Sequence, residues 1–576
     1  MNPTNSGQNA NCVENLIAQK AASRLQKKDA SLYKEVADEA QVKNSLGWAD
    51  LASSPPFALD EIVAIAGNIR QEGLDAVVLI GQGGSSQASM TITSLFRLSQ
   101  GIDVDFYTLD SLSPVFVNKA LQATDPSRTL YIVSSKSGST IEPLMLERVV
   151  WAYVSGILGS AGAAKRFVAI TDPGSKLEQM ALVKDYRYVL SSPADVGGRF
   201  SALCVFALFP CACAGIDIKK VVGIAAQMEQ RCAEDPADNP ALDLACFIFD
   251  NYQQGRDKIA FVTPQSGAVF GLWLEQLIAE STGKLGKGIL PYIETDTSHL
   301  QSPFEDRLII AYSIGNLEGF EDSLKLIDPS MPFRHYQLDN IDELFGLFIV
   351  WEYVTALVGL LMEINPFDQP DVEDTKKRVR KLLSGLDAEE ALSSPPVDEQ
   401  ELDYLEITFP EPDYIRSLRI SQELIRSSGL VPGEITVESA LTALFGSLAR
   451  GDYFSINAFV PYHESSRCEA LERMRNHVAS RLGVAACQEI GPRYLHSTGQ
   501  LHKGGPSTGV FCFISVDEAE DLAIPDEEFT LGMLAATQAK GDFIANAARN
   551  RRALHIHLTN NDPQTLNSLA NRFCTH

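Results

Sequence analysis

The sequence lacks several features that would each point to a particular class of protein. It has no CxxC pair among its ten cysteines, no basic cluster to offset a net charge of −26, and no signal-peptide pattern at its N-terminus. A zinc site or a disulfide framework is therefore not expected; cysteines in apolar stretches, such as Cys204, Cys211, Cys213 and Cys512, are typical of buried thiols. The acidic charge argues against a nucleic-acid partner. We also find no apolar run long enough to cross a membrane, and we expect a cytoplasmic location.

What is present is a long chain of ordinary globular composition, with 576 residues, 45% of them apolar and 21% charged. This length favours two or three domains. Strand-like apolar runs alternate with helical stretches, which predicts doubly wound parallel sheets. The expected division is a helical N-terminal arm (1–60), two α/β domains (61–240 and 241–395) and a C-terminal α/β segment (396–576). The predicted strands are Leu74–Ile80, Val104–Leu109, Leu130–Val133, Arg166–Ile170, Arg187–Leu190, Lys258–Val262, Leu308–Ser313, Tyr453–Val460, Gly509–Ser515 and Ala553–Leu558.

Two of these strands run into turns rich in glycine or hydroxyl groups and then into helices. The sequence GQGGSS follows Ile80, and SSKSGST follows Val133. Glycines allow close backbone approach, and a helix that begins there directs N–H groups at an anion, so both turns suit phosphate. A serine-rich surface turn is the plain alternative. Dinucleotide binding ranks lower, because the G-x-G-x-x-G spacing is absent.

Other polar groups stand out later in the chain. Arg199, in DVGGRFS, is either a surface ion-pair partner or a single guanidinium with a function in a site. Glu280 ends an apolar helical face, so it is either a solvated carboxylate or a base with a raised pKa. The segment 364–373 (INPFDQPDVE) follows a long apolar helix predicted over Leu344–Leu361. Two of the nine histidines, His496 and His502, lie in one glycine-flanked loop that lacks the partners of a metal site.

Taken together, six strings resemble the glucose-6-phosphate isomerase family, whose members are built from sugar-isomerase (SIS) domains: GQGGSS, SSKSGSTIEP, VGGRFSAL, EQLIAESTGK, EINPFDQPDVE and HSTGQLHKGG. The variant most similar to this chain is the isomerase half of bacterial transaldolase/isomerase fusions. The resemblance implies two SIS-type, flavodoxin-like parallel-sheet domains with an additional C-terminal α/β segment. It also implies aldose-ketose isomerisation of a sugar phosphate without cofactor or metal, and a homodimer with neither nucleic-acid nor membrane partners.

Site residues follow from the resemblance, motif by motif. The residues similar to the family's phosphate-binding groups are Ser85, Ser135, Lys136, Ser137 and Thr140, with Gly84 and Gln369 as further substrate contacts. Glu280 matches the catalytic base and Arg199 the residue that stabilises the enediolate. Lys376 matches a lysine beside the sugar ring.

Histidine departs from the family pattern. The family places its ring-opening histidine before the FDQ segment, with glutamine four and glycine nine residues later. Here that spacing occurs after it, at His496, which we prefer to His299 and His335. Two other functions remain open: isomerisation of another sugar phosphate, such as mannose 6-phosphate or an amino sugar phosphate, and non-catalytic regulation by sugar-phosphate binding.

Overall fold

The structure, a computed structural model, describes residues 10–315, 318–372, 378–379, 382–383, 403–410, 413–462 and 465–576. Contacts divide the chain into two compact units. The first comprises Met1–Asp110 and Ala120–Asp368, and the second comprises Ser111–Lys119 and Gln369–His576. The finer boundaries at residues 60, 240 and 395 stay predictions.

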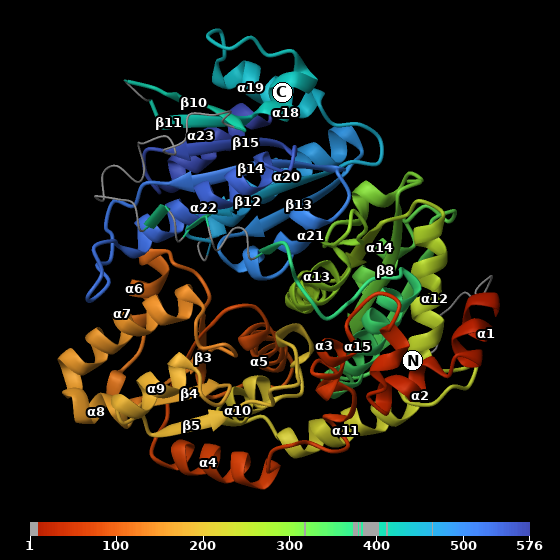
Figure 1. The fold of residues 1–576 in the computed structure, drawn as a ribbon. Coiled ribbons are helices and arrows are strands. Elements are labelled where there is room, and N and C mark those ends of the chain that lie inside the picture. Colours follow the sequence, from red (N-terminus) through yellow and green to blue (C-terminus); the bar gives the residue numbers. More distant parts are fainter. Residues whose placement is uncertain are drawn as a thin grey trace. The chain divides into compact units, whose positions relative to one another are not determined.

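The first unit contains a five-stranded parallel sheet with the order β2-β1-β3-β4-β5, which is the flavodoxin-like order. Its strands are β1 (Ala76–Gly81), β2 (Asp105–Leu109), β3 (Thr129–Ser134), β4 (Phe167–Thr171) and β5 (Tyr188–Ser191). Figure 1 labels β3, β4 and β5 of this sheet. All five strands were predicted to within two residues at each end. The predicted fold class is thereby confirmed for this part of the chain.

Both faces of this sheet are covered by helices. The helices are α4 (Leu59–Gln71), α5 (Gln87–Ser99), α7 (Ile141–Leu158), α8 (Ser160–Ala164), α9 (Lys176–Val183) and α10 (Val205–Cys213). Helix α6 (Pro114–Gln122) belongs to the second unit up to Lys119. Val77 and Leu79 of β1 join one hydrophobic cluster with residues of α5 and α10. On the opposite face, the ring of Phe167 stacks on that of Tyr131. Strands buried on both faces need continuous apolar sequence, which is why they could be read directly.

A second parallel sheet in the same unit has the order β7-β6-β8-β9. Its strands are β6 (Lys258–Val262), β7 (Leu290–Glu294), β8 (Arg307–Ile314) and β9 (Phe333–Leu338), and its helices are α11 (Ile218–Cys232), α12 (Pro240–Gln253), α13 (Ala268–Thr282), α14 (Glu318–Leu324) and α15 (Leu344–Leu361). β7 and β9 were not predicted. The sheet confirms the second parallel α/β domain.

Helix α15 corrects the expectation that no segment is long and apolar enough to span a membrane. Ile341–Leu361 passes that test by length and composition, with a mean hydropathy of 2.0. The structure buries 89% of its most apolar window inside the first unit. There α15 packs against α11, α12 and α13, so every side of the helix needs apolar residues.

The N-terminal arm contains short helices and corrects the reading of the cysteines. The predicted helical arm consists of α1 (Ala10–Ala18), α2 (Ala21–Gln26) and α3 (Glu39–Lys43), and Lys20, with a left-handed backbone of φ 53°, separates α1 from α2. Cys12 forms a disulfide with Cys246, 234 residues away. The two thiols meet because α1 packs on α12. The other eight cysteines are free.

The second unit has one six-stranded mixed sheet in the order β10-β11-β15-β14-β12-β13. Its strands are β10 (Tyr404–Thr408), β11 (Ile415–Ser421), β12 (Tyr453–Phe459), β13 (Ala485–Ile490), β14 (Gly509–Val516) and β15 (Arg552–Leu558), and its helices are α18 (Gln422–Ser428), α19 (Val437–Gly446), α20 (Ser465–Leu482), α21 (Gly499–Gly504), α22 (Leu531–Ala547) and α23 (Pro563–Phe573). β12 to β15 are parallel, whereas β10 and β11 are antiparallel additions. This unit contains the predicted additional α/β segment.

Candidate active site

The turn after β1 is shaped by close backbone contact with the Arg199 loop. A short 3₁₀ turn, η3 (Gly83–Ser85), joins β1 to α5. A Cβ added to Gly84 would lie 1.9 Å from the carbonyl oxygen of Gly198, so only glycine fits there. The hydroxyl of Ser201 donates to the carbonyl of Gly84 at 3.0 Å. Two strings that are 110 residues apart in the chain therefore form one piece of structure.

The turn after β3 lies beside the first one. The Ser134 hydroxyl donates to the carbonyl oxygen of Ser85 at 2.8 Å. Gly138 has φ 60°, and a Cβ there would lie 2.7 Å from that of Ser175. Helix α7 then begins at Ile141, and the Thr140 side chain makes no capping hydrogen bond. A helix N-terminus next to two polar turns is suited to an anion.

Ser135, at 3% exposed, has a buried hydroxyl in this turn that makes no hydrogen bond with any described residue. Such a group costs about 1–3 kcal/mol relative to one that is paired. By contrast, the hydroxyls of Ser137 and Ser139 lie 3.0 Å apart on the surface, where they contact each other.

Lys136 has a different setting from the one that its sequence position suggested. Its ammonium group lies 2.8 and 3.1 Å from the two carboxylate oxygens of Asp172. It also donates to the carbonyls of Pro193 and Ala194, at 3.2 and 3.1 Å. Lys136 thus ties the turn after β3 to the loops after β4 and β5, with its charge balanced by Asp172. A direct contact with phosphate stays a prediction.

Arg199 is an interior residue, not a surface ion-pair partner. It lies in η5 (Gly198–Phe200) and is 4% exposed. Its Nε donates to the Ser281 hydroxyl at 2.7 Å, and its Nη2 donates to the carbonyls of Pro366 and Asp368 at 2.6 and 3.0 Å. Burial lowers the pKa of Arg199, while the charge of Glu280 opposes that shift. The guanidinium is thus fixed by its donors on several sides.

Glu280 lies next to this guanidinium. An oxygen of its carboxylate is 3.4 Å from Nη1 of Arg199, and the amide of Gln276 donates to the other oxygen at 3.3 Å. Only 12% of the Glu280 side chain is exposed, although it is in the last turn of α13. The solvated-carboxylate reading is therefore wrong. A carboxylate that can take a proton, beside a cation that keeps its own, suits proton transfer next to a carbonyl.

The segment after α15 is held through its backbone carbonyls by three cations, of which Arg199 and Lys284 are buried and Lys287 is partly buried. Besides the two bonds from Arg199, Lys284 donates to the carbonyl of Asn365 at 2.8 Å and contacts both the carbonyl and the carboxylate of Asp368. Lys287 donates to the carbonyl of Met362 at 2.7 Å. Sequence reasoning missed both lysines. Their acceptors are backbone carbonyls, which every residue carries, so the sequence held no signal for these contacts.

The remaining predicted residues belong to the second unit. Gln369 is exposed and is the first residue after the boundary. His496 ends the 3₁₀ turn η9 (Arg493–His496) and is partly buried. The amide of Gln500, in the same loop, donates to the Asp371 carboxylate at 2.7 Å, and the Asp371 N–H donates back to Gln500 at 3.0 Å. Lys376 lies outside the described residues. Within the described residues, no group of three His, Cys, Asp or Glu side chains could hold a metal ion.

Comparison with known proteins places these motifs in a family. The family model described as Phosphoglucose isomerase matches residues 63–299, which include both polar turns, Arg199 and Glu280. A glucose-6-phosphate isomerase of Mycoplasmopsis pulmonis is 30% identical over 392 residues, covering 59% of this chain and 90% of that protein. Two solved structures are also similar. The structure of a hypothetical protein from Thermus thermophilus has 25% sequence identity and a TM-score of 0.53, and the match covers 64% of this chain and 97% of that one. The structure of a glucose-6-phosphate isomerase from Chlamydia trachomatis has 18% identity and a TM-score of 0.51, and the match covers 66% of this chain and 86% of that one.

Proposed function

Because this chain belongs to the phosphoglucose isomerase family, we propose that it catalyses the reversible isomerisation of glucose 6-phosphate and fructose 6-phosphate. The observation that carries the proposal is the pairing of Glu280 with the buried Arg199, 3.4 Å apart. A protein that only binds a sugar phosphate has little need for a base held next to a fixed cation. The resemblance to transaldolase fusions stays a prediction.

In the proposed reaction, the sugar ring opens and Glu280 takes the proton from C2 of the open-chain aldose. The electrons of that C–H bond form the double bond of a cis-enediolate, and negative charge moves onto the carbonyl oxygen at C1. Arg199 stays charged and stabilises that oxygen. The oxygen at C1 then gains a proton as the hydroxyl on C2 loses one, and Glu280 returns its proton to C1 to give the ketose.

The phosphate is the remote anchor of the substrate in this proposal. Ser85, Ser135, Ser137 and Thr140 present hydroxyls in the two neighbouring turns, with Gly84 allowing close approach of the backbone. Binding energy gained at the phosphate would hold the reacting carbons in place. Since Lys136 is paired with Asp172, hydroxyls and N–H groups would supply most of these contacts.

Three further residues enter the proposal from the family resemblance alone. His496 would move protons during ring opening, with Lys376 assisting, because an imidazole ring can both donate and accept a proton. Gln369 would contact the substrate. The homodimer and the cytoplasmic location are proposals of the same kind; analytical ultracentrifugation measures the first and cell fractionation the second.

A coupled assay of glucose 6-phosphate formation from fructose 6-phosphate tests the proposal. We expect Glu280→Gln to lower kcat by at least about 1,000-fold, with little change in affinity for fructose 6-phosphate. Glu275→Gln is the matched control: five residues rotate a helix by about 140°, so it alters the same group on another side of α13. Substantial activity in Glu280→Gln would remove Glu280 as the base.

The wild-type assay also separates the alternatives. Turnover of mannose 6-phosphate in preference to fructose 6-phosphate would indicate an isomerase for a different sugar. If fructose 6-phosphate raises the melting temperature of the protein but no phosphorylated sugar is converted, the chain is a sugar-phosphate-binding regulator.

A further inference from the structure

Lys284 is a buried lysine whose contacts all go to one segment of the chain. It follows α13 in the turn Lys284–Lys287 and is 2% exposed. Its ammonium group contacts the carbonyl of Asn365, the carbonyl of Asp368 and the carboxylate of Asp368. An ammonium group has three N–H donors, so these three acceptors match its full capacity.

The Asp368 carbonyl is the point where Lys284 and Arg199 meet. Nη2 of Arg199 donates to that same oxygen and to the carbonyl of Pro366, within the four residues that Lys284 holds. Arg199 in turn lies against Glu280. The position of the guanidinium therefore depends on a stretch of backbone whose own position depends on Lys284.

We propose that Lys284 is a positioning residue for the isomerisation proposed above, on which this inference rests: by holding residues 365–368, it keeps Arg199 aimed at Glu280 and at the oxygen on which enediolate charge develops. Lys284 itself contacts neither the substrate nor the reacting atoms in this proposal. Its loss should slow the chemical step more than it weakens binding of the sugar phosphate.

The electrostatic setting of Lys284 makes the role sensitive to pH. Three charged groups face its ammonium: Arg199 from η5, Asp368 from the segment after α15, and Glu280 from α13. Burial, followed by the neighbouring charge of Arg199, lowers the pKa of Lys284 to about 8, against the opposing effect of Asp368. Lys284 is therefore charged at neutral pH and loses its proton as the pH rises through about 8, with one donor lost and the carboxylate of Asp368 left without a counter-charge.

The test compares kcat and KM of wild type, Lys284→Met and Lys284→Arg between pH 6.5 and 9.5. We expect Lys284→Met to lower kcat about 100-fold with KM changed by less than about threefold. The alkaline decline in wild-type kcat should be absent in Lys284→Met. In Lys284→Arg, part of the activity should return and the decline should move to higher pH, because a guanidinium stays charged.

Lys287→Met is the matched control. Lys287 lies in the same turn and also donates to a carbonyl of the segment after α15, but its acceptor, Met362, is not shared with Arg199. Its kcat should stay within about twofold of wild type, even if the protein becomes less stable. Urea unfolding of each variant separates a loss of fold from a loss of positioning.

Each outcome decides the inference. If wild type is active and Lys284→Met keeps its kcat, or if Lys284→Met and Lys287→Met lose kcat equally, Lys284 has no special role, while the proposed function stands. If Lys284→Met does not fold, the pH profiles of wild type and Lys284→Arg decide, and identical profiles overturn the inference. An inactive wild type refutes the proposed function, and this inference with it.

Discussion

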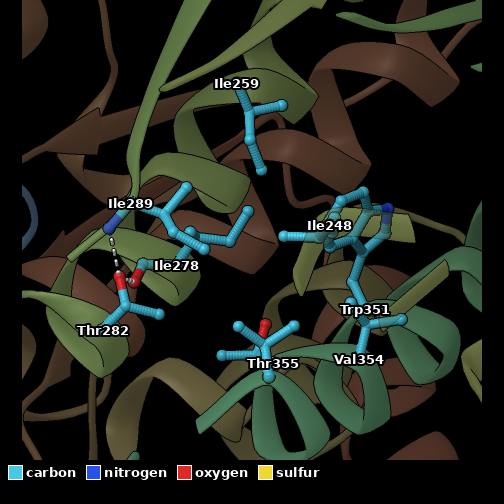
Figure 2. A pocket seen from close by; sticks show the side chains of 9 residues that line it. Ile248, Ile259, Ile278, Thr282, Ile289, Trp351, Val354 and Thr355 are labelled. Carbon is cyan, nitrogen blue, oxygen red and sulfur yellow. Dashed lines mark hydrogen bonds between the residues drawn. The ribbon is translucent and has the colours of Figure 1, made fainter. Parts of the chain in front are cut away.

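Two threonines that line one small cavity give the most direct test of the packing around helix α13. The cavity has a volume of about 10 Å³ and is bounded by α12, α13, α15 and the strand regions near Ile259 and Ile289. Figure 2 shows Thr282 bonded to the backbone nitrogen of Ile289 on one side and Thr355 on another. We expect Thr355→Val to stabilise the first unit and Thr282→Val to destabilise it.

The two expected signs follow from the hydrogen bonds of the two hydroxyls. The Thr355 hydroxyl is buried and has no partner. A cavity of about 10 Å³ is at the lower limit for one water, which would also need two or more polar neighbours. The Thr282 hydroxyl, by contrast, donates to the Ile278 carbonyl at 2.8 Å and accepts from the Ile289 N–H at 3.0 Å.

The magnitudes can be set from these contacts. Valine has nearly the volume of threonine, so Thr355→Val mainly removes an unsatisfied hydroxyl, and we expect a gain of about 1 kcal/mol in the free energy of unfolding. Thr282→Val removes one hydrogen bond and leaves a second buried group, the Ile289 N–H, unsatisfied. A loss of about 2–3 kcal/mol is expected, which makes the two variants differ by roughly 3–4 kcal/mol.

Tryptophan fluorescence during urea unfolding is the appropriate assay. All four tryptophans, Trp48, Trp151, Trp273 and Trp351, belong to the first unit, so the signal follows that unit without a contribution from the second. The midpoints should be compared at equal m-values, because a changed m-value would mean a changed unfolding transition. Equal shifts for the two variants, or a gain for Thr282→Val, would refute the assignment of these hydrogen bonds.

Two kinetic predictions address the residues whose roles rest mostly on the family resemblance. Ser135→Ala should raise the KM for fructose 6-phosphate about tenfold, since one hydrogen bond to a charged group is lost, with kcat nearly unchanged; an unchanged KM would remove Ser135 from the phosphate contacts. His496→Ala should lose more activity on ring-closed glucose 6-phosphate than on substrate that is already open. Equal losses on the two forms would count against a ring-opening role.

The parts of the fold that could be predicted are those whose sequence is apolar without interruption. β1 and β3 are buried on both faces, and α15 is buried on all sides, so the pattern itself defines them. β9 was missed because its burial alternates and it contains Arg334 and His335. β10 was missed because it is only partly buried and carries Glu406. The left-handed residue Lys20, which separates α1 from α2, leaves no trace in composition.

Some residues of the candidate site could likewise be predicted from the sequence, and others could not. Glu280 and Arg199 could be proposed because they stand in short strings that resemble a family, and the structure places them in contact. Lys284 could not, because two of its three acceptors are backbone carbonyls, and every residue has one. The partner of Lys136 could not be predicted from the sequence either. Asp172 lies 36 residues away, and only the parallel pairing of β3 and β4 brings the two loops together.

The pairing of Arg199 with Glu280 bears on how an acidic protein can stabilise a new negative charge. The chain carries a net charge of −26, and Lys136, one of the predicted phosphate contacts, is balanced by Asp172. Arg199 and Lys284 are likewise balanced by Glu280 and Asp368, so the buried cluster is neutral before reaction. In the proposed reaction, the charge of Glu280 disappears when it takes a proton from the substrate, and an equal charge forms on the enediolate oxygen. Arg199 then exchanges one counter-charge for another, and the cluster plus substrate keeps the same total charge throughout. Stabilisation of the enediolate would therefore come from fixed groups whose positions need not change, which is the condition under which buried electrostatics contribute most to a rate.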